Sequence, residues 1–160
     1  MSGKTTLARK MAAQAASNNR NVLVLDPLKD SRWLDAGASF LTDNPDEFIS
    51  LAKQNTNCTL IIDEAGEFCG RYDKESFWLA TRSRHRGHQS IFCSQRPNLI
   101  SPNIRSNCSK IFCFCVNYKD AKSFAEDFCC DELENASNLK QGECIYYSRY
   151  GEAKRYNVFS

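Results

Sequence analysis

Residues 59–68, TLIIDEAGEF, combine a continuous apolar run with two adjacent carboxylates. The run over residues 59–62 predicts a short strand that is buried on both faces. Asp63 and Glu64 follow it directly, and open α/β sheets bind their ligands at the carboxyl ends of their strands. A strand that ends in a solvated acidic turn is the simpler interpretation, so the rest of the sequence has to decide between the two.

Similar apolar runs recur along the chain and alternate with segments of helical composition. This alternation is typical of a mostly parallel sheet that helices cover on both faces. One helix is expected to have Asn44 as its cap and Pro45 as its first residue. The 160 residues show no repeat or linker, so we expect one α/β domain, residues 1–160. The predicted strands are residues 21–26, 58–62, 89–94 and 110–116, the helices are 5–17, 43–54, 73–86 and 118–130, and a terminal hairpin pairs 143–150 with 153–159.

Composition excludes several classes of protein. Hydrophobic residues make up 42% and charged residues 25% of the chain, which is ordinary for a globular domain. No stretch reaches the roughly 18 apolar residues of a spanning helix, so we expect no membrane segment in this chain. The nine cysteines include no CxxC pair, and there are two histidines, which favours reduced thiols in a cytosolic protein over a zinc site.

The chain begins MSGKTTLARK, where GKTT precedes a helical segment. A complete phosphate-binding loop reads G-x-x-x-x-G-K-[ST], so Gly3, Lys4 and Thr5 match its second half, and Thr6 extends the match into the helix. In this interpretation Lys4 bridges the β- and γ-phosphates of ATP, and the Thr5 hydroxyl binds Mg²⁺. A GKT sequence also occurs by chance.

The same chemistry gives the acidic residues roles. Asp63 would hold Mg²⁺ directly or through water, and Glu64 would orient and deprotonate the attacking water. Gln95 lies just past the predicted strand 89–94, where its amide could sense the γ-phosphate. Residues 81–110 contain six Lys or Arg and no carboxylate, whereas the rest of the chain holds 15 basic and 19 acidic residues. This basic segment predicts an anionic partner, although a solvated basic helix would show the same pattern.

The combination of GKTT, LIIDE and RSRHRGHQSIFCSQRP resembles the P-loop ATPases of the FtsK–HerA class. Within that class it is most similar to the ATPases that package viral and phage genomes into preformed capsids. The resemblance runs from Ser2 to about Val116, and the SQRP element with its upstream arginines is its most specific part. It implies a P-loop NTPase three-layer sandwich with a mostly parallel sheet and a C-terminal hairpin.

The resemblance also implies an activity: an ATPase that uses ATP and Mg²⁺ to translocate double-stranded DNA, working as a ring in the host cytoplasm or on the virion. The DNA would be contacted through its phosphates, and a capsid or portal protein is a further implied partner. GKTT would be the Walker A motif and LIIDE the Walker B motif, with Glu64 as catalytic base and Gln95 as sensor. A neighbouring subunit would supply an arginine, for which Arg84 is the first candidate and Arg86 the second. Arg105 is the third candidate, and Arg71 and Lys74 are candidate DNA contacts.

One departure from the family pattern concerns the start of the chain. The family has a strand and a first glycine before the GK, whereas Met1 and Ser2 stand there in this sequence. We therefore expect a domain truncated within its phosphate-binding loop, through either a displaced start or a genuine remnant. Three other interpretations stay open: a conjugation or filamentous-phage assembly ATPase, a catalytically inactive DNA-binding remnant, and a small-molecule kinase.

Overall fold

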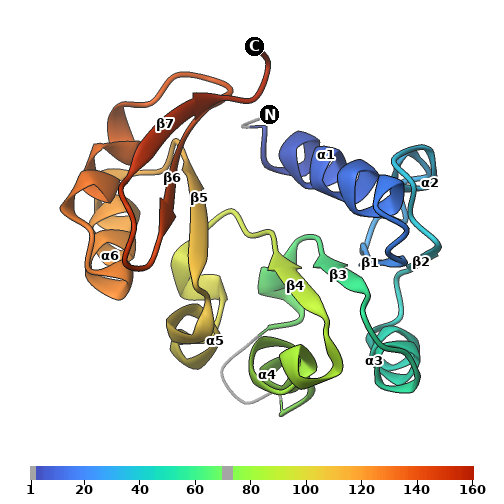
Figure 1. The fold of residues 1–160 in the computed structure, drawn as a ribbon. Coiled ribbons are helices and arrows are strands. Elements are labelled where there is room, and N and C mark those ends of the chain that lie inside the picture. The colour runs from blue at the N-terminus through green and yellow to red at the C-terminus, as the bar shows by residue number, and fades with distance from the viewer. Residues whose placement is uncertain (1–2, 70–73) are drawn as a thin grey trace.

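Four parallel strands form the sheet on which the fold is built, in the order β2-β1-β3-β4 (Figure 1). The computed structural model of the protein describes residues 3–69 and 74–160. Every residue of β1 (Val22–Leu25) and β3 (Thr59–Ile62), the two central strands, is buried, as their apolar sequences predict. β4 (Gln89–Phe92) and β2 (Phe40–Thr42) lie at the two edges of this sheet.

Helices cover both faces of the parallel sheet. Successive residues of a strand point to opposite faces, so each strand contributes apolar side chains to both helical layers. Leu60 and Ile62 face one helical layer, and Ile61 faces the other. The first layer consists of α3 (Pro45–Gln54), α4 (Lys74–Thr81) and α5 (Pro102–Asn107). The second layer consists of α1 (Lys4–Ser17) and α2 (Arg32–Asp35). The predicted three-layer α/β sandwich is therefore confirmed.

A second, antiparallel sheet has the order β5-β6-β7. It contains β5 (Lys110–Phe114), β6 (Glu143–Ser148) and β7 (Lys154–Asn157). α6 (Tyr118–Phe128) and the 3₁₀ segment η4 (Asp131–Asn138) pack on one of its faces. The terminal hairpin was predicted, but β5 was expected to belong to the mostly parallel sheet. It pairs instead along its length with β6.

Several boundaries differ from those that the sequence predicts. The helix predicted over residues 73–86 ends at Thr81, and a 3₁₀ turn, η2 (Ser83–Arg86), follows it before Gly87. Asp73 lies outside the described residues. β2, with three residues, is too short for its periodicity to be recognised, and α5, which begins at Pro102, is not among the predicted helices. Proline is tolerated at the first position of a helix, where its missing N–H is not needed.

The start of α3 agrees with prediction in detail. The Asn44 side chain accepts hydrogen bonds from the backbone N–H groups of Asp46 and Glu47, and Pro45 is the first helical residue.

Shorter 3₁₀ turns complete the chain: η1 (Ala65–Glu67) follows β3, and η3 (Pro97–Leu99) follows β4. Within residues 3–69 and 74–160, no helix has the length and apolar character needed to cross a membrane.

His88 joins α3 to the amino end of β3, and its replacement provides a test of the fold. Its buried ring accepts a hydrogen bond from the Cys58 N–H at Nδ1 and contacts the Ala52 carbonyl through Nε2 at 2.9 Å. We expect His88→Ala to lower the free energy of unfolding by about 2–4 kcal/mol, because it leaves the buried Cys58 N–H unpaired and removes one of the contacts of the Ala52 carbonyl. Urea denaturation measures this loss. The exposed His85 is the matched control, since His85→Ala should change stability by less than about 0.5 kcal/mol, and equal losses in the two variants would contradict the assigned role of His88.

Candidate active site

The acidic pair lies at the carboxyl edge of the parallel sheet. The Asp63 N–H donates to the Leu25 carbonyl at 2.9 Å, which extends the β1–β3 pairing by one residue, and Asp63 is 9% exposed. Its Oδ1 accepts a hydrogen bond of 3.1 Å from the backbone N–H of Glu64. Glu64 has a left-handed backbone, with φ 46° and ψ 45°. Such a conformation is uncommon for a residue with a side chain and is often found at functional sites.

Gln95 and Glu64 are brought together at this edge. The Gln95 Nε2 donates to the two carboxylate oxygens of Glu64 at 3.2 and 3.4 Å. The backbone fixes this approach, because the Cys93 N–H donates to the Ile62 carbonyl and the Ala65 N–H donates to the Cys93 carbonyl. The segments after β3 and β4 are thus held side by side. The Gln95 amide therefore adjoins the Glu64 carboxylate from the neighbouring strand.

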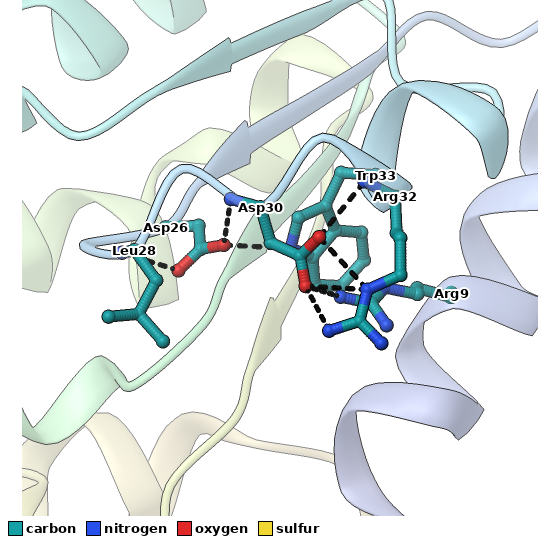
Figure 2. Close-up of polar contacts among 6 residues, drawn as sticks. All are labelled: Arg9, Asp26, Leu28, Asp30, Arg32 and Trp33. Atoms are coloured by element: carbon teal, nitrogen blue, oxygen red, sulfur yellow. Dashed lines mark hydrogen bonds and ion pairs between the residues drawn. The ribbon is translucent and has the colours of Figure 1, made fainter.

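Asp26 is a site residue that sequence reasoning missed. It follows β1 directly, is 2% exposed, and accepts three hydrogen bonds, from Leu28 N–H, Asp30 N–H and Trp33 Nε1–H (Figure 2). Hydrogen bonds to a charged group contribute about 1.5–3 kcal/mol each. Asp26 therefore organises the loop after β1. An acidic residue that closes an apolar run was a usable signal, since Asp63 shows the same pattern.

Arg9 connects this loop to α1. Its Nη2 donates to Asp30 Oδ2 at 2.5 Å, and its guanidinium lies 5.1 Å from the centre of the Trp33 ring (Figure 2). Arg32 also donates to Asp30, and these hydrogen bonds, together with that from Arg9, hold the pKa of the Asp30 carboxyl well below its usual range. The helix that begins with the GKTT match is thereby fixed to the carboxyl edge of β1.

Negative charge accumulates at the carboxyl edge. Burial raises the pKa of Asp63, and the nearby charges of Asp26 and Glu64 raise it further. The Glu64 N–H and Arg9 oppose this shift, but the net direction is upward. Raised carboxyl pKa values from burial and like charge are common where a cation or a proton is used.

The N-terminus of α1 comes to the same edge. Burial raises the pKa of the Cys93 thiol, and the charge of Asp63 raises it further. The charge of Lys4 lowers the same pKa, so the Lys4 amine and the Asp63 carboxylate both influence the Cys93 thiol. Within residues 3–69 and 74–160, no side chain caps α1 and no acidic residue lies in its first turn, and its N-cap Gly3 has φ 101°. A Cβ on Gly3 would lie 3.0 Å from the Phe114 ring, so the position favours glycine in space as well as in conformation. Thr5 and Thr6 are half-buried in the first turn.

The candidate arginines do not reach this edge within one chain. Arg84 and Arg86 lie in η2, before β4, and the Asn57 N–H donates to the Arg86 carbonyl ahead of β3. They therefore occupy the amino-end side of the sheet, opposite Glu64. Arg105 forms an ion pair of 2.6 Å with Asp127 and is mostly buried, which indicates a structural role. Lys74 is exposed at the start of α4, and Arg71 lies outside the described residues.

These groups define what the site could hold. The carboxylate of Asp63 and the hydroxyl of Thr5 are oxygen donors of the kind that Mg²⁺ prefers. An uncapped helix N-terminus with a lysine in its first turn is suited to phosphate groups. The donor set of this chain therefore fits a magnesium nucleotide.

Known structures share this fold. The genome packaging NTPase B204 from Sulfolobus turreted icosahedral virus 2, solved in complex with AMPPCP, matches with a TM-score of 0.82 and 17% identity, over 98% of this chain and 92% of that one. The N-terminal domain of zonular occludens toxin from Neisseria meningitidis matches with a TM-score of 0.54 and 19% identity, over 98% and 88%. VirB4 of Thermoanaerobacter pseudethanolicus matches with a TM-score of 0.52 and 13% identity, over 80% of this chain and 45% of that one.

By sequence, no family model and no curated protein matches the chain. The structural similarity nevertheless shows that it has the P-loop NTPase fold that its motifs predict.

The raised pKa of Asp63 gives a stability prediction. Ionisation of this carboxyl destabilises the folded state, so the stability present below the unfolded pKa of about 3.9 is lost as the pH rises through the higher folded value. We therefore expect Asp63→Asn to unfold about 2–4 °C above the parent at pH 7, on the order of 1 kcal/mol, with the difference shrinking near pH 4. Thermal melts across this pH range measure it. Asp35→Asn, at an exposed position, is the control, and an Asp63→Asn variant that melts below the parent at pH 7 would contradict this account.

Proposed function

We propose that this chain is the motor domain of an ATP-hydrolysing DNA translocase that packages viral double-stranded DNA into a capsid. The observation that carries the proposal is the Gln95 amide bound to the Glu64 carboxylate, beside the buried Asp63. A base, a metal ligand, a sensor and a phosphate-binding helix end are the parts that ATP hydrolysis needs. The similarity in fold to a viral packaging NTPase supports the same function.

Each residue has a chemical role in this proposal. Gly3, Lys4, Thr5 and Thr6 bind the phosphates through the helix N-terminus and the lysine charge. Mg²⁺, held by Thr5 and Asp63, would neutralise charge on the β- and γ-phosphates. Glu64 accepts the proton of the attacking water. The hydrogen bonds from Gln95 orient the Glu64 carboxylate. A change at the γ-phosphate that moves Gln95 would therefore also change the orientation of Glu64, the catalytic base.

The position of the arginines supports a ring. Because Arg84 and Arg86 lie on the amino-end side of the sheet, they cannot complete the site of their own chain. In a head-to-tail ring, one face of each subunit meets a different face of the next. An exposed arginine on the far side of one subunit can then act on ATP bound to its neighbour. We propose Arg84 for this role, with Arg86 as the second choice.

The DNA partner would be bound through its phosphates, without sequence preference and with strong salt dependence. A capsid or portal protein would be the second partner, and the motor would work in the host cytoplasm or on the virion. The conjugation and phage-assembly alternative is supported less strongly, since VirB4 and the zonular occludens toxin domain match with TM-scores of 0.52 and 0.54, against 0.82 for the packaging NTPase.

Hydrolysis assays test the proposed activity. The complete loop pattern has a glycine and four residues before Gly3, so both the chain itself and a version with these residues added should be measured. We expect ATP turnover that double-stranded DNA stimulates, and we expect Glu64→Gln to reduce it by about 10²-fold or more, because a general base contributes about 10²–10⁴-fold. Phosphate release measures the rate.

The exposed Glu67, in the turn that follows Glu64, is the matched control, and Glu67→Gln should leave turnover within about twofold. Turnover that ignores DNA would contradict the translocase proposal while leaving an ATPase. Failure of both versions to bind ATP would contradict the ATPase proposal and favour an inactive DNA-binding module.

Mixing variants tests whether Arg84 acts in trans. Alone, Arg84→Ala and Glu64→Gln should each lose activity, by about 10³-fold for the arginine. In mixed rings, some interfaces pair an intact Glu64 from one subunit with an intact Arg84 from the next, so activity should partly return. Arg82→Ala, at an exposed neighbouring position, is the control and should stay active by itself. Mixtures without recovery would exclude Arg84, and the same experiment would then be repeated with Arg86→Ala.

A further inference from the structure

The antiparallel sheet has two unlike faces. One face, which includes Ile111, Cys113 and Ile145, packs on α6 and η4. Strand register and alternation place the remaining side chains on the opposite face, which we call the aromatic face. The aromatic face consists of Lys110, Phe112 and Phe114 from β5, Cys144, Tyr146 and Ser148 from β6, and Lys154 and Tyr156 from β7.

Burial on the aromatic face falls from one end to the other. Phe114 and Cys144 are 4% and 1% exposed, because Val158 and Leu7 of α1 pack over them. Phe112 and Tyr146, one row further along, are half-buried. Tyr156 is 48% exposed, and Lys110 and Lys154 are exposed. α1 therefore covers only one end of this face.

The uncovered rings form a connected platform. Tyr146 is central, because it pairs across the strands with Phe112 on one side and with Lys154 on the other. The centres of the Phe112 and Tyr146 rings are 4.8 Å apart, and those of the Tyr146 and Tyr156 rings are 6.2 Å apart in an edge-to-face arrangement. Such contacts hold aromatic side chains in fixed orientations. The exposed Tyr156 ring is thus held by its contact with Tyr146, whose ring in turn contacts Phe112.

All charged side chains of the aromatic face are positive. Its two charged side chains are Lys110 and Lys154, and none of its eight residues is acidic. Lys154 adjoins Tyr146 directly across the strands, and Lys110 lies two residues from Phe112 on the same strand. Aromatic rings flanked by cations on an exposed sheet are what single-stranded nucleic acids bind, with bases stacked on the rings and phosphates near the lysines.

We propose that the aromatic face binds single-stranded nucleic acid, with bases stacking on Tyr156 and Tyr146 and phosphates contacting Lys154 and Lys110. A duplex fits less well, because its bases are already stacked on one another and present only phosphates. A second copy of the chain also fits less well, since two such faces would bring lysine against lysine, and interface cores are depleted of charge. The binding does not depend on the proposed ATPase activity or on the carboxyl edge of the parallel sheet.

A binding titration without nucleotide tests this proposal. The probe is a labelled oligothymidylate about ten nucleotides long, within the range of known single-strand sites, and its anisotropy reports affinity at low salt. We expect Tyr156→Ala to weaken binding by about 5- to 100-fold, the range found when a stacking residue is truncated, and Tyr156→Phe to stay near the parent. Tyr118→Ala, which removes another exposed tyrosine at the start of α6, should leave affinity unchanged.

Lys154→Gln gives a second measure that does not depend on the aromatic ring. It should weaken binding and reduce the slope of log K against log salt by about 0.7, the value for one phosphate contact on a single strand. Circular dichroism melts check that each variant is folded.

Three results would overturn the proposal. The first is an affinity for the oligothymidylate that Tyr156→Ala and Lys154→Gln both leave unchanged. The second is competition by a duplex of equal length that is as strong as competition by the single strand. The third is sedimentation as a dimer that Tyr156→Ala dissociates, which would assign the face to a second copy of the chain.

Discussion

The in-register pairing of β1, β3 and β4 is the constraint on which the rest of the structure depends. Leu25 pairs with Ile62, and Ile62 pairs with Phe92, so three strands end at the same level. The residues that follow, Asp26 and Asp63 among them, are therefore placed side by side. Burial fixes this register, because a shift by one residue would turn every apolar side chain of a central strand to the wrong face. The site is thus a consequence of the way in which the core packs.

Charge at this edge is balanced by a helix from outside the sheet. Asp26 accepts its hydrogen bonds from the loop after β1, including one from the Asp30 N–H. Arg9 of α1 contacts the same loop by donating to the Asp30 carboxylate. Burial raises the pKa of Asp63, and the charges of Asp26 and Glu64 raise it further. The arrangement stores an unfavourable concentration of negative charge that a bound cation would relieve. Functional sites often retain such locally unfavourable electrostatics because the fold supplies the stability elsewhere.

The molecule presents distinct chemistry in three places. The carboxyl edge of the parallel sheet is acidic and holds Gln95 against Glu64. The amino-end side carries the exposed arginines of η2. The antiparallel sheet adds the aromatic face, whose exposed end bears lysines. In the ring that we propose, the acidic site of one copy would meet an exposed arginine of the next.

The fold class, the central strands and the positions of the candidate residues at strand ends follow from local patterns in the amino-acid sequence. Continuous apolar runs bounded by acidic residues or glycine are local signals, and residues such as Asp63, Glu64 and Gln95 stand immediately after them. Tertiary structure decided what depends on partners distant in the chain. The pairing of β5 with β6, which assembles much of the aromatic face, and the link from Arg9 to Asp30 each join segments 20 or more residues apart. Side-chain contacts of this kind leave no periodic pattern along the chain, because they arise only when the packing of separate elements brings the two partners together.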